Sequence, residues 1–147
     1  MGDSLRLRRA TMDDADIILE WVNDPLDRAN SFDSRMISRE EHLAWMRDSL
    51  DDPTRFLYIL EDDGVPVGHI KLYREGDRAD LGYCIAPSCR GRGYARTMLR
   101  LLVDAVHVED AGIKTIVASV KPQNEASIKA LLGNGYVEAM RVFELDV

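Results

Sequence analysis

The sequence predicts a single α/β domain in which strands and helices alternate along the whole chain. Three observations support this fold class. The 147 residues suffice for one hydrophobic core. Apolar residues change several times between helical spacing and extended runs. No repeat, linker or low-complexity tract divides the chain, so we expect one domain over residues 1–147 in the order β-α-α-β-β-β-α-β-α-β.

The first third of the chain predicts a short strand and two capped helices. Each helix opens on a capping box, in which a hydroxyl and a carboxylate three residues later bind free amides of the first turn. Each ends at an Asp-Pro step, because proline cannot continue a helix. The elements are a strand around Leu5 and Leu7, a helix from Thr11 and Asp14 to residues 23–25, an ordered loop to Ile37, and a helix over 38–50 opened by Ser38 and Glu41.

The middle of the chain changes to extended spacing at Arg55. An aromatic and branched run over 56–60 is followed by a turn signal at 62–64, and apolar residues resume over 65–73. This pattern predicts a β-hairpin. A second turn at Asp77 leads to a third strand over 80–86.

The last third returns to helical spacing and then alternates again. Apolar residues recur with helical period over 95–106, and Gly112 marks the end of this helix. A β-branched run over 115–120 predicts a buried strand. Asn124 caps a short helix over 125–132, two glycines end it, and weak alternation over 136–145 predicts a last strand.

Charge and composition exclude several classes of function. The 19 basic and 26 acidic residues give a net charge of −7, which repels phosphate backbones, so we expect no nucleic-acid partner. No stretch approaches the roughly 18 apolar residues that span a bilayer, and the N-terminus lacks a signal peptide. We therefore expect no membrane contact and a cytoplasmic location. Cys84 and Cys89 have no second pair and no nearby histidine, so no disulfide framework or metal site is expected.

The most informative segment joins the third strand of the middle region to the long helix, over residues 85–95. Gly91 and Gly93 allow several backbone N–H groups to converge on one anion, and the helix dipole adds positive potential there. The segment lacks the Gly-Lys-Ser/Thr of a Walker A loop. Arg96 stands where a dinucleotide fingerprint needs its third glycine. The pyrophosphate of another cofactor remains as the expected ligand.

Two motifs carry a family resemblance. Arg90, Gly93 and Ala95 match the pattern Gln/Arg-x-x-Gly-x-Gly/Ala. A strand, a helix with Asn-x-x-Ala/Ser and a Gly-aromatic step follow at the proper separation, matched by Val120, Asn124, Ser127, Gly135 and Tyr136. In these motifs and in element order, the chain resembles the GNAT superfamily of acyl-CoA-dependent N-acetyltransferases.

The resemblance implies a fold and a cofactor site. The fold would be a central mixed, largely antiparallel sheet flanked by helices and splayed between the strands ending at Ile85 and Val120. Acetyl-CoA would be the co-substrate, with its pyrophosphate on the amides of 91–95 and its pantetheine on the strand edge near Ile85, and no metal is implied. The residues expected to bind it are Ile85, Arg90, Gly91, Arg92, Gly93, Tyr94, Ala95, Asn124 and Ser127.

Residues in the first third resemble one branch of the superfamily, the enzymes that acetylate nucleotide-linked 4-amino sugars, as in the pseudaminic acid pathway. The matching segments are 18–25, 31–32 and 37–38, with His42 and Trp45, although Val22 stands where that branch usually has arginine. The expected partner is a small-molecule amine. A protein N-terminus or another small amine as acceptor, or a non-catalytic acyl-CoA-binding module, remain alternatives.

The chemistry requires a base and an acid. A primary ammonium must lose a proton before it can attack a thioester, and Asp80, through a water, or His42 could accept it. Many family members carry a tyrosine seven residues after the motif asparagine to protonate the thiolate, but Leu131 occupies that position. Either water protonates the thiolate and turnover is slow, or the hydroxyl of Tyr83 or Ser127 substitutes. Direct transfer is expected, because Cys89 has no histidine partner that would make it a nucleophile.

The end of the chain predicts an open sheet edge. Eleven residues follow Tyr136, which is enough for one strand but scarcely for the hairpin that usually closes a GNAT sheet. Exposed edges invite pairing with another chain. A homodimer is therefore one expected assembly.

Overall fold

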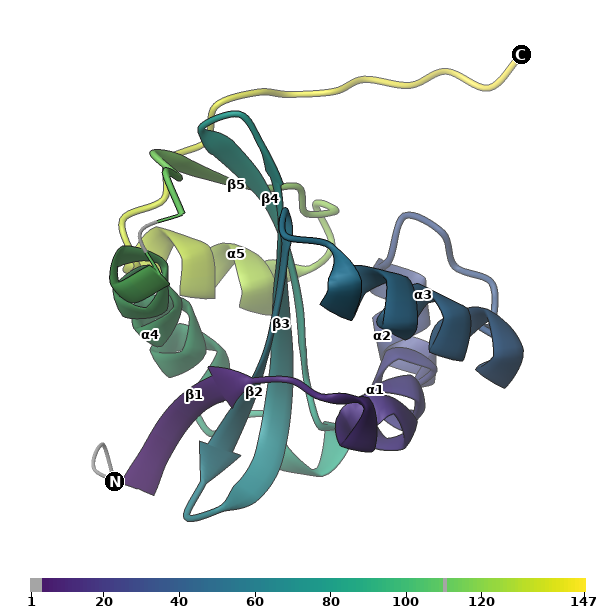
Figure 1. The fold of residues 1–147 in the computed structure, drawn as a ribbon. Helices are drawn as coiled ribbons and strands as arrows, with labels where there is room; N and C mark the ends of the chain where they lie inside the picture. The colour runs from purple at the N-terminus through teal and green to yellow at the C-terminus, as the bar shows by residue number, and fades with distance from the viewer. Residues whose placement is uncertain (1–3, 110) are drawn as a thin grey trace.

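A computed structural model describes residues 4–109 and 111–147 (Figure 1). Five strands form one sheet in the order β1-β2-β3-β4-β5. The first four are paired antiparallel, and β4 and β5 run parallel. The strands are β1 (Leu5–Arg9), β2 (Arg55–Asp62), β3 (Val65–Glu75), β4 (Arg78–Ile85) and β5 (Thr115–Ala118). The predicted α/β class with a mixed, largely antiparallel sheet is confirmed.

Helices cover both faces of the sheet (Figure 1). One face carries α1 (Ala15–Val22), α2 (Pro25–Asn30) and α3 (Arg39–Asp51), and the other carries α4 (Tyr94–Glu109) and α5 (Glu125–Gly133). Two 3₁₀ turns, Met12–Asp14 and Pro87–Cys89, complete the regular structure of the described residues. None of these helices is long and apolar enough to cross a membrane.

The alternation of each strand builds two cores, one on each side of the sheet. Ile59 on β2 packs with Ile18 and Met46 of the first helical layer. Ile70 on β3 packs with Leu99 of α4 in the second. All five side chains are fully buried. The sheet is thus fixed from both sides, and residues that alternate along β3 and β4 face different layers.

The predicted helix starts are confirmed in their main contacts. The Thr11 backbone N–H donates to the Asp14 carboxylate at 2.9 Å, at the turn that leads into α1. Ser38 Oγ accepts from the Glu41 N–H at 3.1 Å at the start of α3. The Glu41 carboxylate pairs instead with Arg35, at 2.7 Å.

The loop predicted after residue 24 begins as a helix. Asp24 accepts hydrogen bonds from the N–H groups of Leu26, at 3.1 Å, and Asp27, at 3.4 Å, and so caps α2. Pro25 occupies the first helical turn, where its fixed φ is favourable and its missing N–H costs nothing. The proline that ends α1 therefore also starts α2.

The strand predicted over 136–145 is not formed. Residues 137–147 have no regular secondary structure and lie exposed (Figure 1). A strand needs a neighbouring strand for its backbone hydrogen bonds, and this segment runs away from the sheet. Among the described residues, β5 has only β4 as a neighbour, so its other edge is unpaired.

Candidate active site

The sheet opens between β4 and β5, as expected. Pairing runs from Arg78 with Thr115 to Leu81 with Ala118, where β5 ends. β4 continues to Ile85 with only β3 beside it. The backbone groups of 82–85 that face the open side can therefore pair with an extended, amide-bearing ligand.

One backbone N–H at this opening can be assigned a direction. The Ala86 N–H donates to the Val67 carbonyl at 2.8 Å, toward β3. Successive N–H groups along a strand point to opposite sides, so the Ile85 N–H points to the open side. The end of β4 therefore presents a hydrogen-bond donor in the gap between the strands.

The loop after β4 forms an anion-binding shape. Gly91 and Gly93 have φ values of 78° and 81°, in the left-handed region that favours glycine. None of the backbone N–H groups over 91–95 donates to an acceptor in the described chain. A Cβ added at either glycine would meet nothing within 4 Å, so the space beside the loop is open. These amides stand at the start of the 16-residue helix α4, whose dipole favours an anion.

Two side chains of this loop, Arg90 and Tyr94, have partners elsewhere in the chain, whereas Arg92 is exposed. Arg90 Nη2 lies 2.7 Å from Asp24 Oδ2, and this pair holds the pKa of Asp24 below its usual range. The Tyr94 hydroxyl donates to Asp62. Arg96 lies against Gly133, where a Cβ would stand 2.8 Å from the guanidinium carbon. Arg90 and Tyr94 thus tie the loop to its neighbours, while its backbone amides are left free to bind a ligand.

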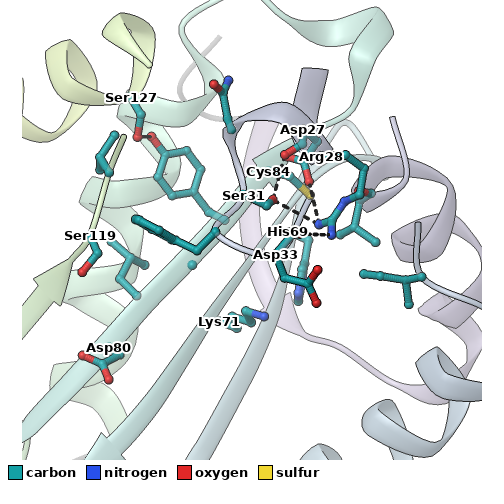
Figure 2. Close-up of a pocket in the computed structure, with 18 of the residues that line it drawn as sticks. Asp27, Arg28, Ser31, Asp33, His69, Lys71, Asp80, Cys84, Ser119 and Ser127 are labelled. Carbon is teal, nitrogen blue, oxygen red and sulfur yellow. Dashed lines mark hydrogen bonds and ion pairs between the residues drawn. The ribbon is translucent and has the colours of Figure 1, made fainter. Parts of the chain in front are cut away.

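A cavity of about 680 Å³ lies beside the opening, between the sheet and the layer of α1, α2 and α3 (Figure 2). Its lining includes His42, His69, Lys71, Asp80 and Cys84 on one side of the sheet. It also reaches Tyr83, Asn124 and Ser127 on the side of α5. A substrate in this cavity would meet a ligand held in the gap between β4 and β5.

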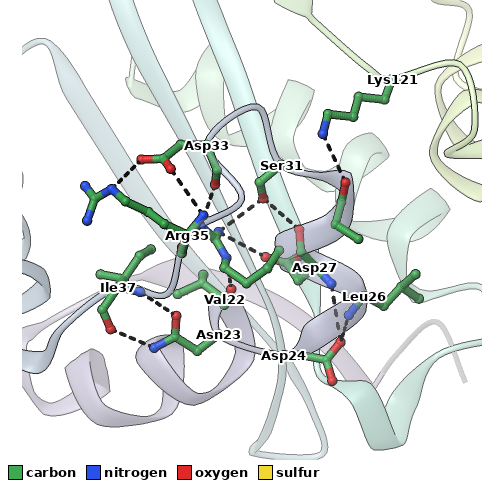
Figure 3. Close-up of polar contacts among 12 residues, drawn as sticks. Val22, Asn23, Asp24, Leu26, Asp27, Ser31, Asp33, Arg35, Ile37 and Lys121 are labelled. Carbon is green, nitrogen blue, oxygen red and sulfur yellow. Dashed lines mark hydrogen bonds and ion pairs between the residues drawn. The ribbon is translucent and has the colours of Figure 1, made fainter.

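The wall formed by residues 31–37 is fixed by polar contacts (Figure 3). Asn23 binds both backbone groups of Ile37, donating to its carbonyl at 2.8 Å and accepting from its N–H at 2.9 Å. Arg28 donates to the Asp33 carbonyl at 3.0 Å and to Ser31 Oγ at 3.1 Å. These contacts hold residues 31–37 against α1 and α2, where they form one wall of the cavity.

The two candidate bases lie on the cavity but on different elements. His42, on α3, is buried, and its Nε2–H donates to the Ala15 carbonyl at 2.8 Å, which leaves the lone pair on Nδ1. Burial lowers the pKa of His42, so its ring is neutral at pH 7. Asp80, on β4, is exposed and makes no ion pair within the described chain.

The two candidate acids lie in contact. The Tyr83 hydroxyl and Ser127 Oγ are 2.6 Å apart. Ser127 is held by Asn124, whose side chain accepts its N–H at 3.3 Å and caps α5. Burial raises the pKa of Tyr83, so its hydroxyl keeps its proton at neutral pH. Leu131 is buried in the core, so the tyrosine position of other family members is filled by packing here.

Sequence reasoning missed the contributions of β3. His69 lines the cavity; its Nδ1–H donates to the Tyr58 carbonyl at 3.0 Å, and its buried Nε2 has no partner in the described chain. Lys71 also lines the cavity. The signal was present in the alternation of β3, because His69 and Lys71 are two residues apart and share one face.

Comparisons with known proteins agree with this geometry. Residues 4–137 match the acetyltransferase (GNAT) domain family. A Bacillus licheniformis protein described as an uncharacterized N-acetyltransferase p20 is 26% identical over 137 residues, which are 88% of this chain and 76% of that protein.

Two solved structures share the fold. The Salmonella typhimurium protein yncA, a putative acetyltransferase with acetyl-CoA, has a TM-score of 0.75 and 24% identity, with 91% of this chain and 80% of that chain covered. Spermidine N-acetyltransferase from Vibrio cholerae, in complex with CoA and spermine, has a TM-score of 0.84 and 21% identity, with 94% and 83% covered. The family match over nearly the whole sequence shows that this chain belongs to the GNAT acetyltransferases.

Proposed function

We propose that this protein transfers the acetyl group of acetyl-CoA directly to a primary amine held in the cavity beside β4. The observation that carries the proposal is the junction of three features: the open edge of β4, the unpaired amides of 91–95 and a cavity that reaches both. An acyl donor along the β4 edge and an amine in the cavity would meet at this junction.

The loop and the strand edge fit the acetyl donor. The amides of Gly91 to Ala95 bind the pyrophosphate, because they are unpaired in the described chain and lie at the start of α4. The open edge of β4 pairs with the pantetheine amides, and the Ile85 N–H stabilises the oxyanion of the tetrahedral intermediate. The arginine of the motif, Arg90, acts by fixing the loop to Asp24.

The proton transfers use both sides of the sheet. Asp80, through a water, or His42 takes the proton from the ammonium on the side of α1 and α3. The neutral amine then attacks the thioester carbonyl, and the nitrogen of the tetrahedral intermediate loses a second proton to water. The intermediate collapses to the amide as the C–S bond breaks. The Tyr83–Ser127 pair, on the side of α5, donates a proton to the departing thiolate.

The acceptor is a small-molecule amine, for which a nucleotide-linked amino sugar is the specific candidate. Related folds act on varied amines: one neighbour is described with spermine, and another, AAC(6')-Ib, with ribostamycin. In this chain Arg28 and Arg35, which line the cavity, are paired with Asp27, Asp33 and Glu41. Binding of a diphosphate at these arginines would require those pairs to rearrange.

A panel of amines tests the proposal. Release of coenzyme A thiol is measured with a nucleotide-linked amino sugar, small amines including spermidine, and N-terminal peptides. Amine-dependent thiol release is expected, and the fastest amine identifies the acceptor class. Binding of acetyl-CoA without turnover of any amine would contradict catalysis and favour an acyl-CoA-binding module.

The free edge of β5 supports a homodimer. Residues 137–147 are exposed and include Val142, Phe143 and Leu145, which are at least 73% exposed. A second copy that pairs with this edge would satisfy the backbone hydrogen-bonding groups of β5. A second copy that covers these side chains would remove apolar surface from water.

A further inference from the structure

Most of the charged side chains that line the cavity form ion pairs with one another, and two do not. Arg28 lies 3.5 Å from Asp27, and Arg35 lies 3.0 Å from Asp33. Arg35 also binds Glu41, at 2.7 Å. Within the described residues, this leaves two lining side chains of opposite charge that make no ion pair, namely Lys71 and Asp80.

The Lys71 side chain is held in a defined position. Lys71 pairs in register with Gly82, and a Cβ on that glycine would lie 2.9 Å from Lys71 Cε. Gly82 therefore lets the side chain lie flat across β4. Lys71 Nζ stands 4.9 Å from the Trp45 ring centroid and 5.3 Å from that of Tyr73. Trp45 Nε1 donates to the Tyr73 hydroxyl at 2.6 Å, so the two rings form a rigid frame around the ammonium.

The groups around Lys71 do not neutralise it. The rings of His42 and His69 face the same cavity, and burial is the main cause that lowers their pKa values, to about 4 for His69. Lys71 contributes to both shifts. Both imidazoles are therefore neutral at pH 7, and neither supplies the negative charge that an ammonium in a cavity favours.

We propose that the acceptor amine carries an oxyanion, a carboxylate or a phosphate, and that Lys71 binds it while the amine faces the opening beside β4. This inference rests on the proposed function and specifies its acceptor. Gly82, opposite Lys71, directly follows the last β4 residue paired with β5. The oxyanion therefore lies close to the point of transfer, only a few bonds from the amine.

The charge of Lys71 also selects against other acceptors. A charge-assisted hydrogen bond from an ammonium to an oxyanion is among the stronger polar contacts. A polyamine would bring a second ammonium toward Lys71 and be repelled. Asp80 is the remaining unpaired charge and attracts the reacting ammonium before it loses its proton.

Matched acceptors test this inference without a variant. Thiol release is measured for O-phosphoethanolamine against ethanolamine, for 4-aminobutanoate against 4-aminobutanamide, and for spermidine. We expect the anionic member of at least one pair to have a kcat/KM about tenfold or more above that of its neutral partner. A hydrogen bond to a charged group is strong enough to produce a difference of this size. The pair that shows the preference distinguishes phosphate from carboxylate.

Variants assign the preference to Lys71. Lys71→Met should bring the ratio of kcat/KM between the anionic acceptor and its neutral partner close to one. Lys71→Arg should keep most of the preference, and the control Lys114→Met, at an exposed position outside the cavity, should keep all of it. Lys71→Gln serves in place of Lys71→Met if that variant does not fold.

Two results would overturn the inference, and they differ from failure of the proposed function. Neutral or polycationic amines that react as fast as anionic ones would contradict it while leaving acetyl transfer intact. An equal loss for both members of a pair in Lys71→Met would show a structural role instead. No thiol release with any amine would contradict the proposed function itself.

Discussion

At the residue scale, we propose that the hydroxyl pair of Tyr83 and Ser127 takes the place of the acid that position 131, a leucine, does not supply. We expect Tyr83→Phe to lower kcat by at least about tenfold while the affinity for acetyl-CoA is kept, because general acid catalysis contributes about 10²–10⁴-fold. Ser127→Ala should have a smaller effect, since it removes only the partner of the tyrosine hydroxyl at 2.6 Å. Steady-state kinetics and calorimetric titration of each variant measure the two quantities.

The raised pKa of Tyr83 fixes the sign of its pH dependence. A proton donor is active below its pKa, so loss of this donor should appear only above the ordinary tyrosine value of 10.0. Ionisation of Tyr83 should therefore cause no fall in wild-type kcat between pH 7 and 10. If neither Tyr83→Phe nor Ser127→Ala slows the reaction, water or another group protonates the thiolate.

His69 gives the protein a pH-dependent stability. Its pKa falls from 6.5 to about 4 on folding, so below pH 6.5 the unfolded state binds a proton that the folded state does not. Stability from this group is complete above pH 6.5 and is lost as the pH falls toward 4. Lowering the pH from 7 to 5 should therefore reduce the free energy of unfolding by about 2 kcal/mol through His69. Urea unfolding at several pH values measures the slope.

A substitution isolates this contribution. His69→Asn keeps a donor for the Tyr58 carbonyl but cannot titrate, and its slope between pH 7 and 5 should be shallower than that of the wild type. His107→Asn, at an exposed position on α4, is the matched control and should keep the wild-type slope. Equal slopes in all three proteins would show that His69 is not neutral in the folded state.

Part of the site could be predicted from single residues. Local spacing predicts that the glycines at 91 and 93 lie on a loop before a helix. The hydroxyls at 83 and 127 are candidates only because the family resemblance leaves no acid at position 131, and spacing does not predict that they meet. The alternation of β3 places Lys71 on the face of His69, but its position against Gly82 and within the frame of Trp45 and Tyr73 could not be predicted. Those contacts join segments far apart in the sequence, and spacing does not report them.

At the scale of elements, the proposed cofactor site lies at the turn from β4 into α4. Acetyl-CoA should raise the melting temperature of the wild type, and Gly93→Asp should remove that increase. Aspartate would place a side chain and a negative charge where the amides face the anion, at a φ of 81° that side chains rarely adopt. Thermal denaturation with and without acetyl-CoA measures the shift.

Another glycine supplies the control for this variant. Gly76, in the turn between β3 and β4, has a φ of 66° and open space at its Cβ position, like Gly93. Gly76→Asp therefore introduces the same strain and charge away from the loop. It should lower the melting temperature but keep the increase with acetyl-CoA. An unchanged increase in Gly93→Asp would contradict the placement of the pyrophosphate.

Most elements could be predicted because their signals are local. Capping residues, turn signals and a change of apolar period placed α1, α3, α4, α5 and all five strands in the right order. α2 was missed because its six residues bury no side chain, so it has no apolar face to reveal it. The predicted strand over 136–145 has the right alternation but no neighbouring strand, and pairing is a property of the sheet rather than of the segment.

At the scale of the whole molecule, the exposed residues 137–147 and the open edge of β5 predict self-association. We expect a concentration-dependent dimer by light scattering. Phe143→Lys should weaken it, because it places a charge on a side chain that is 88% exposed in the monomer. Val108→Lys, at an equally exposed position on α4, should not. A protein that stays monomeric at high concentration would contradict the dimer.

The central claim is that a cofactor on the 91–95 loop and an amine in the cavity react directly with each other. The most direct test is to measure coenzyme A release and N-acetylated product together, by thiol assay and mass spectrometry, with and without the best amine of the panel. Direct transfer predicts that release depends on the amine, that thiol and product form in equal amounts, and that no acetylated protein accumulates. Release without amine, or an acetyl group on Cys89 that then moves to the amine, would contradict it.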